Sequence, residues 1–356
     1  MENTPFFSVV IPIYNSEKYL QDAVESILHQ DFEDFQVVLV DDYSSDASRE
    51  ICTALQEKDE RVQTVFLEKN GGASHARTVG LQSARGKYIL FMDADDTLCD
   101  SLFSKAYTEA SACSPDVILF DAEEVYLHAD GTEYNRVAVR YPQKRLFTPS
   151  EVQKEVISIE KTTLFGYLWN KFYSADLLRR SNVPFADIPL NEDFKFNIDI
   201  FPYVASLSAL GVCGYRYYKR DNQSLTCRFV QNYFELQTVR IQYLLDFHTH
   251  LNICSDAVLE TLCAIYVRSV YSALQRNMDS RANMKRKAQK NWLIAQYHSD
   301  LYQTLLPYAK PEGKLQAVMS NALQKKNTVL VFGIARAVYL VKEKFPVLFS
   351  KLKQNR

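Results

Sequence analysis

The sequence predicts an α/β protein in which a mostly parallel sheet is followed by a helical C-terminal region. Short runs of β-branched residues alternate with amphipathic stretches over the first hundred residues, and acidic side chains directly follow two of these runs. From about Val230 onward, long stretches contain few glycine or proline residues, as helices do. The length of 356 residues is comfortable for two domains.

Strands and helices are expected to alternate from the N-terminus. The runs that predict buried strands are residues 7–13, 35–40, 62–67 and 88–92. Helical periodicity lies between them, over residues 18–30, 48–58 and 73–84. Ser16 is a suitable N-cap for the first of these helices. This order implies parallel strands with helices on both faces of the sheet.

The pattern is less regular after the first hundred residues. Further strands are expected over residues 116–120 and 136–141, and a helix is expected to start within 149–158. Helical or apolar character then marks residues 233–251, 257–276, 283–296 and 328–340. We therefore expect an N-terminal domain of residues 1–228 and a helical region of residues 229–356.

Cysteine usage and the first residues favour a cytoplasmic protein. The seven cysteines are scattered and form no CxxC pair, which argues against a disulfide framework or a zinc knuckle and fits a reducing cytosol. The opening MENTPFFSVVIP has no basic segment before its apolar stretch, so it is not typical of a signal peptide. No run of 18 uninterrupted apolar residues predicts a membrane-spanning helix.

Charge is unevenly distributed along the chain. Residues 1–275 carry 25 Lys and Arg against 39 Asp and Glu, whereas residues 276–356 carry 16 against 4. The basic end is expected to meet something anionic, either a membrane surface or an acidic partner. The alternative is a helical cap that packs on the N-terminal domain. The acidic body argues against nucleic acid as a partner.

The acidic stretch Asp93-Ala94-Asp95-Asp96 is the first candidate site. Alternate side chains of a strand project to the same side, so Asp93 and Asp95 are expected to point together. Neighbouring carboxylates repel unless a cation lies between them, and Mg²⁺ or Mn²⁺ takes such oxygen ligands and bridges diphosphates. The alternative is a solvated acidic turn, or a cluster that caps the following helix.

Two further candidates surround strand ends. Asp42, at the end of a predicted strand, would accept from a ribose hydroxyl or a base N–H, or it forms a turn that caps the helix from Ser48. Asn70-Gly71-Gly72 permits close backbone approach to an anion at a helix N-terminus, one turn before Arg77. The alternative there is a plain turn with a surface arginine.

The last two candidates lie later in the chain. Asn191-Glu192-Asp193 offers a carboxylate that would act as a general base for a sugar hydroxyl, or it is a capped helix start. The aromatic and basic stretch 215–220 includes Arg216 and Arg220, whose cations would neutralise a leaving diphosphate. The alternative is an edge strand with alternating charges.

The joint order of these motifs resembles glycosyltransferase family 2, inverting enzymes with the GT-A fold. The matching stretches are Ser8-Val9-Val10-Ile11-Pro12-Ile13-Tyr14-Asn15, Val40-Asp41-Asp42-Tyr43-Ser44-Ser45-Asp46, Asn70-Gly71-Gly72 through Arg77 and Gly80, Gly86-Lys87-Tyr88-Ile89, Asp93-Ala94-Asp95-Asp96, Trp169-Asn170-Lys171 and Glu192-Asp193. The resemblance covers residues 6–226 and not the C-terminal third. One departure is Tyr43, where family members often have glycine, and this residue would narrow the mouth of the base pocket.

The resemblance implies a role for each matched residue. The nucleotide-sugar site would comprise Pro12, Tyr14, Asn15, Asp42, Asn70, Gly71, Arg77 and Asp93, with Tyr14 stacked on the base, Arg77 near the phosphates and Asp93 on the ribose. Asp95 would bind Mn²⁺ or Mg²⁺. Asp193 would be the catalytic base with Glu192 beside it, and Trp169 and Lys171 would border the acceptor cleft, with Arg216 and Arg220 in the acceptor or diphosphate region.

The function implied is an inverting, metal-dependent transfer of a sugar. The donor would be a nucleotide-diphosphate sugar, a UDP-sugar by expectation, and the acceptor a hydroxyl of a glycan or lipid-linked saccharide in cell-surface polysaccharide synthesis. The alternative is a non-catalytic protein that binds nucleotide sugars or scaffolds an assembly complex. The basic, apolar C-terminus is expected to dock on the inner membrane face.

Overall fold

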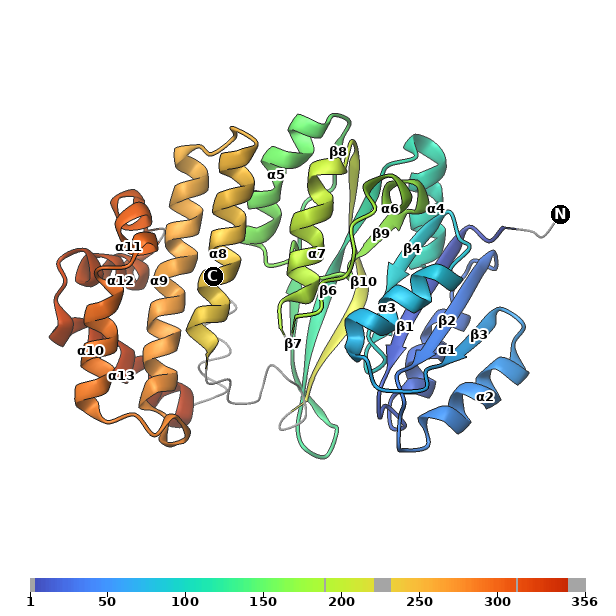
Figure 1. Cartoon of the computed structure of the whole chain (residues 1–356), viewed down its shortest axis with the longest axis horizontal. Helices are drawn as coiled ribbons and strands as arrows, with labels where there is room; N and C mark the ends of the chain where they lie inside the picture. The colour runs from blue at the N-terminus through green and yellow to red at the C-terminus, as the bar shows by residue number, and fades with distance from the viewer. Residues whose placement is uncertain (1–3, 189, 221–231, 312, 345–356) are drawn as a thin grey trace. The chain divides into compact units, whose positions relative to one another are not determined.

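The computed structural model describes residues 4–188, 190–220, 232–311 and 313–344. Two compact units divide the chain, residues 1–222 and residues 223–356 (Figure 1). The domain boundary expected at residues 228 and 229 lies outside the described residues.

The N-terminal unit is built on one mixed sheet of ten strands. The strands are β1 (Phe7–Ile13), β2 (Phe35–Asp41), β3 (Val62–Phe66), β4 (Tyr88–Phe91), β5 (Thr97–Leu98), β6 (Val117–Leu127), β7 (Glu133–Val139), β8 (Lys144–Leu146), β9 (Lys171–Ser174) and β10 (Leu207–Arg220). Their order is β3-β2-β1-β4-β9-β6-β10-β5, with β7 paired to β6 and β8 to β10. The expected α/β class is confirmed.

The first four strands form the parallel half of the sheet. Every residue of β2 is buried, and so is β1 except for the half-buried Pro12. Burial on both faces explains why these strands read as continuous apolar runs, in which each Val, Ile or Leu contributes roughly 1.5–3 kcal/mol. Because Ile13 pairs with Asp41, the residues that follow β1 and β2 emerge side by side.

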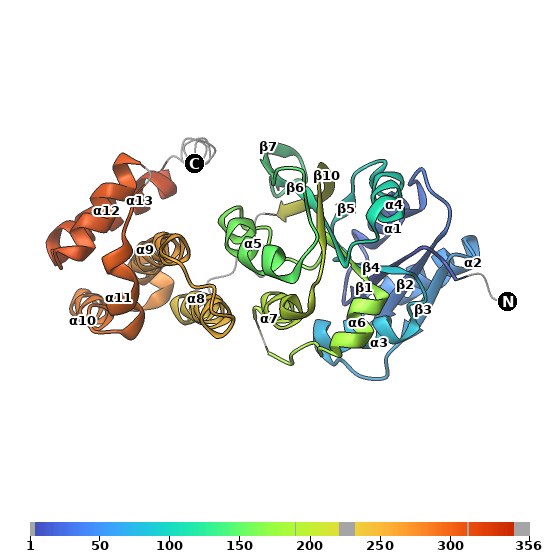
Figure 2. The ribbon, with the colours of Figure 1, turned by 90° about the horizontal axis from the view of Figure 1, so that it is seen from above.

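Helices cover both faces of this half, as expected. They are α1 (Leu20–Leu28), α2 (Ser48–Lys58), α3 (Gly72–Ser83) and α4 (Leu102–Cys113). Figure 2 shows α1 and α4 on one face of the sheet and α3 on the other. Ser16 does not cap α1, because its hydroxyl bonds to the Tyr14 carbonyl oxygen at 3.4 Å and the helix begins at Leu20.

The other half of the sheet is largely antiparallel and was only partly anticipated. The short β9 lies between β4 and β6, antiparallel to both. The 14-residue β10 runs parallel to β6 on one side, and on its other side it pairs with β8 over residues 207–209 and with β5 at Tyr215 and Arg216. Among the described strands, residues 217–220 pair only with β6, so this part of the basic stretch lies at an edge of the sheet. The helices here are α5 (Pro149–Lys161), α6 (Ala175–Ser181) and α7 (Glu192–Ile200).

The C-terminal unit is helical where it is described. Its helices are α8 (Tyr233–His250), α9 (Asp256–Met278), α10 (Arg286–Gln296), α11 (Asp300–Leu305), α12 (Lys314–Gln324) and α13 (Thr328–Lys344). The other five contact α9, in which ten residues are buried. By length and composition α9 would be able to cross a membrane, but such partial burial is also found in the core helix of a soluble unit.

Two glycines of the N-terminal unit are required by close packing. A Cβ on Gly86 would lie 2.5 Å from the Ser8 backbone nitrogen, and one on Gly80 would lie 2.3 Å from Val10 Cγ1. The first contact involves backbone, which cannot rotate away. Gly80 and Gly86 therefore allow their segments of the chain to pack directly against β1.

We predict that Gly86→Ala lowers the free energy of unfolding by roughly 1–3 kcal/mol, the usual cost of overpacking. The matched control is Gly333→Ala in α13, where an added Cβ would meet nothing within 4 Å. That change is expected to leave stability unchanged or to raise it by up to about 1 kcal/mol, since alanine favours helix. Thermal unfolding followed by circular dichroism compares the two, and equal midpoints would contradict the packing argument.

Candidate functional site

The ends of β1 and β2 present two exposed tyrosines. Tyr14 is 54% exposed and Tyr43 is 53% exposed. Asn15 adopts a left-handed backbone with a φ of 52°, and its side-chain oxygen accepts the Ser45 N–H at 2.8 Å. Asparagine tolerates this conformation better than most residues. Tyr43 has a φ of 63°, which is unfavourable for a bulky residue and accounts physically for the glycine expected there.

Asp42 joins the end of β2 to the start of α3. Its two carboxylate oxygens accept the N–H groups of Gly71 and Gly72, each at 2.7 Å, and Asn70 donates to its carbonyl oxygen at 3.2 Å. The carboxylate therefore stabilises the positive end of the α3 dipole. The cap of α2 comes instead from Asp46, which accepts the Ser48 N–H at 3.0 Å.

Arg77 is the centre of the site. Its guanidinium is almost completely buried and contacts three carboxylates from separate segments. Nη1 lies 2.7 Å from Asp193 and 3.4 Å from Glu192 at the start of α7, and Nη2 lies 3.1 Å from Asp93 after β4. Residues far apart in the sequence thus converge on the Arg77 guanidinium. From the sequence, this residue is expected near the phosphates of a nucleotide sugar.

The pKa of the Asp193 carboxyl group lies near neutral pH. Burial raises the pKa of its carboxyl group to about 7, Arg77 acts in the opposite direction, and Glu192 and Asp93 add to the rise. The backbone at Asn191 is left-handed, with a φ of 66°, and this turn sets both acids in the first turn of α7. Sequence predicted the helix start, and the structure adds the shared partner.

Asp95 belongs to a second, adjacent group of charges. Its carboxylate lies 3.2 Å from Nη1 of Arg220, whose Nη2 donates to the Asp95 carbonyl oxygen at 2.7 Å. The guanidinium also lies over the Tyr19 ring, 3.9 Å from its centroid. Burial and the charge of Asp93 raise the pKa of the Asp95 carboxyl group, whereas Arg220 opposes that rise.

Asp96 attaches the acidic loop, residues 93–96, to β10 through hydrogen bonds. It is buried and accepts from the Tyr215 hydroxyl and from the Tyr218 N–H, both at 2.9 Å. The same Tyr215 hydroxyl accepts the Asp93 N–H at 3.2 Å. The Tyr215 ring stacks on Trp169 at 4.3 Å, with 9° between their planes. Sequence reasoning missed these tyrosine contacts, because the aromatic stretch predicts a strand but not its partners.

Three predicted residues make their contacts mainly inside the fold, although the charge of Lys171 also acts on Asp193 and opposes the rise of its pKa. Trp169 is 4% exposed and is stacked between Tyr167 and Tyr215. Lys171 is fully buried, and its ammonium donates to three carbonyl oxygens of the preceding loop and to the Asn170 side chain. Arg216 lies near Glu123 and donates to the Leu98 carbonyl oxygen. All three stabilise the surrounding fold in this structure.

The acidic loop has donors that fit a hard divalent cation. The negative charge of Asp93 makes the charged form of Asp95 less favourable and raises its pKa, so a cation between the two carboxylates would lower the electrostatic energy. Oxygen ligands are those that Mg²⁺ and Mn²⁺ prefer. The side chain of Asp95 is 45% exposed, which leaves it accessible to an ion.

Comparison with known proteins gives consistent results for this unit. Residues 8–169 match the family described as Glycosyl transferase family 2. The chain is 29% identical over 223 residues to the uncharacterized glycosyltransferase EpsJ of Bacillus subtilis, covering 62% of this chain and 63% of EpsJ. It is 39% identical over 127 residues to the glycosyltransferase GlyG of Streptococcus pneumoniae, covering 36% of this chain and 42% of GlyG. The chain therefore spans less than two thirds of either relative.

The fold is also similar to a solved structure. The crystal structure of S. aureus TarS 1–349 in complex with UDP-GlcNAc superposes with a TM-score of 0.63 at 21% identity, covering 93% of this chain and 91% of that one. This likeness confirms the expected GT-A fold. It also extends into the C-terminal helical unit, where the sequence showed no resemblance.

We predict that the Asp193 carboxyl group titrates near pH 7 in the metal-free protein, far above the usual value of about 3.9. It should be protonated below this pH and charged above it. The measurement is the side-chain carboxyl ¹³C shift across pH, assigned by its loss in Asp193→Asn. Glu192→Gln removes a neighbouring negative charge, so it should move the midpoint to lower pH. A midpoint near 4 in the wild type would contradict the role given to burial.

Proposed function

We propose that the chain, whose residues 8–169 match Glycosyl transferase family 2, is an inverting sugar transferase of that family. It moves a sugar from a nucleotide-diphosphate donor to a hydroxyl of a glycan or lipid-linked saccharide in cell-surface polysaccharide synthesis. The observation that carries the proposal is the convergence of Asp93, Glu192 and Asp193 on Arg77. We further propose that residues 1–228 form the catalytic domain.

The proposed donor is a UDP-sugar. Support comes from TarS, which was crystallised with UDP-GlcNAc and with UDP, and whose fold this chain shares. The exposed ring of Tyr14 offers a stacking surface for the base at the carboxyl end of β1, where ligands of parallel sheets bind. In this proposal Pro12, Asn15, Asp42, Asn70 and Gly71 form the rest of the nucleotide site.

Asp193 acts as the general base in the proposed mechanism. Its carboxylate takes the proton of the acceptor hydroxyl while that oxygen attacks the anomeric carbon and the nucleotide diphosphate departs. A pKa near 7 suits a base that works near neutral pH, since it combines adequate basicity with a charged population. Arg77 fixes the position of the carboxylate, and Glu192 adjusts its pKa.

The divalent ion is assigned to the acidic loop. Asp95, with Asp93 beside it, would hold Mn²⁺ or Mg²⁺, which when bound supplies positive charge that neutralises a diphosphate leaving group. Arg220 adds a cation within the same group of charges. Trp169 and Lys171 support this region from inside the fold.

We predict that Asp193→Asn lowers the rate of donor turnover by about 10²–10⁴-fold while UDP binding is retained, because the change removes the base and little volume. The assay measures nucleoside diphosphate released from a panel of donors, with and without Mn²⁺, and calorimetry measures UDP affinity. Asp199→Asn is the matched control, since Asp199 lies in the same helix and pairs with Lys195.

Two outcomes would oppose the proposal. Unchanged turnover in Asp193→Asn would remove this residue as the base. An absence of turnover by the wild type with every donor, together with intact UDP binding, would favour a non-catalytic nucleotide-sugar-binding or scaffold protein.

We also propose that the C-terminal unit docks on the inner membrane face. Lys285, Arg286, Lys287 and Lys290 are exposed around the start of α10. Apolar side chains are exposed on α12 and α13, including Val318 at 47% and Val329 at 84%. Basic side chains near exposed apolar ones match the chemistry of an anionic lipid surface. The lysines of residues 345–356 lie outside the described residues.

We predict that the full chain floats with vesicles containing anionic phosphatidylglycerol and not with neutral phosphatidylcholine vesicles. Replacing Lys285, Arg286, Lys287 and Lys290 by glutamine should weaken binding by several kcal/mol, at about 1 kcal/mol per charge. Arg179→Gln and Lys69→Gln, both exposed in the N-terminal unit, are charge-removing controls. Equal flotation of all variants with both lipids would contradict electrostatic docking.

A further inference from the structure

Two cysteines from distant parts of the chain meet beside the acidic loop. Cys99 directly follows β5, and Cys213 lies in β10 where its pairing with β6 changes register. Their sulfur atoms are 3.0 Å apart, and both are free thiols. A register shift changes the direction of side chains, and here it places the Cys213 thiol against Cys99 at the end of β5.

The charges around this pair act on the thiols in both directions, since Arg216 lowers the pKa of Cys99 whereas Glu123 raises the pKa of both thiols. A carboxylate oxygen of Glu123 lies within 4.8 Å of both sulfur atoms. However, that carboxylate already pairs with Arg136 at 2.9 Å and lies 4.0 Å from Arg216. A divalent ion at this point would have to compete with the guanidinium of Arg136 for the Glu123 carboxylate.

The two thiols are not equivalent. The hydrogen bond from Cys213 lowers the pKa of the Cys99 thiol, burial opposes this effect, and the charge of Arg216 adds to it. The pKa of the Cys213 thiol is raised by the same hydrogen bond and by burial. A thiol with a lowered pKa beside a second thiol is an arrangement that favours disulfide formation after oxidation.

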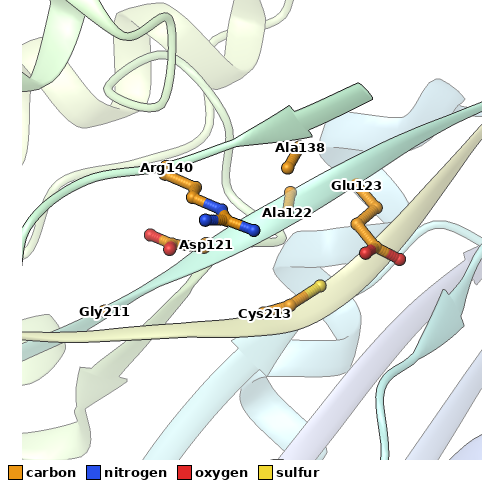
Figure 3. A pocket seen from close by; sticks show the side chains of 7 residues that line it. All are labelled: Asp121, Ala122, Glu123, Ala138, Arg140, Gly211 and Cys213. Carbon is orange, nitrogen blue, oxygen red and sulfur yellow. The ribbon is translucent and has the colours of Figure 1, made fainter. Parts of the chain in front are cut away.

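A cavity reaches Cys213, the less buried thiol of the pair, from one side. This cavity of about 300 Å³ is lined by residues of β6, β7 and β10, among them Cys213 and Glu123 (Figure 3). Asp121 and Arg140 complete its polar wall. Cys99 is only 7% exposed, so an oxidant must be small enough to pass Cys213.

We propose that Cys99 and Cys213 form a reversible disulfide on exposure to a hydroperoxide, which ties the acidic loop to β10. The Cys99 thiolate attacks the terminal oxygen of hydrogen peroxide, its O–O bond breaks, and a sulfenic acid forms with release of hydroxide. The Cys213 sulfur then displaces the sulfenic oxygen as water. Two thiols and one peroxide thus give one disulfide and two waters, and a thiol reductant reverses the oxidation.

The cross-link would act on the site already described. A disulfide requires the sulfurs to close from 3.0 Å to about 2.05 Å. That movement falls on Cys99, four residues after Asp95, and on the strand that ends at Arg220. We expect the closing sulfur atoms to displace Asp95 and Arg220 from their present contact and so to lower turnover, a consequence that rests on the proposed transferase function.

The chemical test uses the full chain treated with one equivalent of hydrogen peroxide. Remaining thiols are alkylated, and the digest is analysed by mass spectrometry. We expect a peptide pair joining Cys99 to Cys213, lighter by two hydrogens and separated by dithiothreitol. In Cys213→Ser, Cys99 should instead be trapped by dimedone as a sulfenic acid. Cys254→Ser, a partly exposed thiol of the other unit, should keep the link.

Specific results would overturn the proposal. Alkylation of both thiols after oxidation would do so, as would one retained zinc ion per chain that is lost in Cys99→Ser and in Cys213→Ser.

A second measurement compares donor turnover of the reduced and oxidised protein. Oxidised wild type should lose most of its turnover, and Cys213→Ser should keep the same rate in both conditions. Equal rates for the two wild-type forms would overturn the effect on the site. An inactive reduced protein would instead contradict the proposed function and leave the disulfide result standing.

Discussion

A buried guanidinium is the constraint on which the site depends. Arg77 lies in α3 with little access to water, and a buried charge is tolerated only when it is paired. The fold satisfies it with carboxylates from the loop after β4 and from the start of α7. Because Arg77 would be an unpaired buried charge without them, these carboxylates favour the conformation that brings the two segments together. The ion pairs of Arg77 that hold the proposed site together therefore also stabilise the fold.

A second layer of polar and aromatic contacts holds the acidic loop in register. Asp96 is fixed by Tyr215 and Tyr218, and the Tyr215 ring rests on Trp169. These side chains are rigid and buried, so they limit where Asp93 and Asp95 are able to move. Lys171 likewise stabilises the loop that precedes it, because its ammonium group donates hydrogen bonds to backbone carbonyl oxygens of that loop. The positions of Asp93 and Asp95 therefore depend on neighbouring residues that lie outside the two charged groups.

Sequence predicted the parallel half of the sheet well and the antiparallel half poorly. Runs such as residues 35–40 are long, apolar and bounded by turns, so local pattern is sufficient. The four-residue β9 carries too little pattern, and its place between β4 and β6 depends on long-range pairing. Asp93 and Asp95 were proposed because they follow a predicted strand, and Glu192 and Asp193 because they begin a predicted helix. The burial of Trp169 and Lys171 was missed because exposure is decided by tertiary contacts, and the meeting of Cys99 with Cys213 for the same reason.

The backbone at Tyr43 carries a cost with a practical consequence. A side chain held at positive φ loses roughly 1–2 kcal/mol relative to a relaxed conformation, and glycine would recover much of it. An engineer seeking heat resistance would therefore choose this turn first. Replacing Tyr43 by glycine would also remove an aromatic ring beside Tyr14, at the edge where we propose that the nucleotide base binds. Thermal stability and donor selectivity therefore place opposite demands on this one residue.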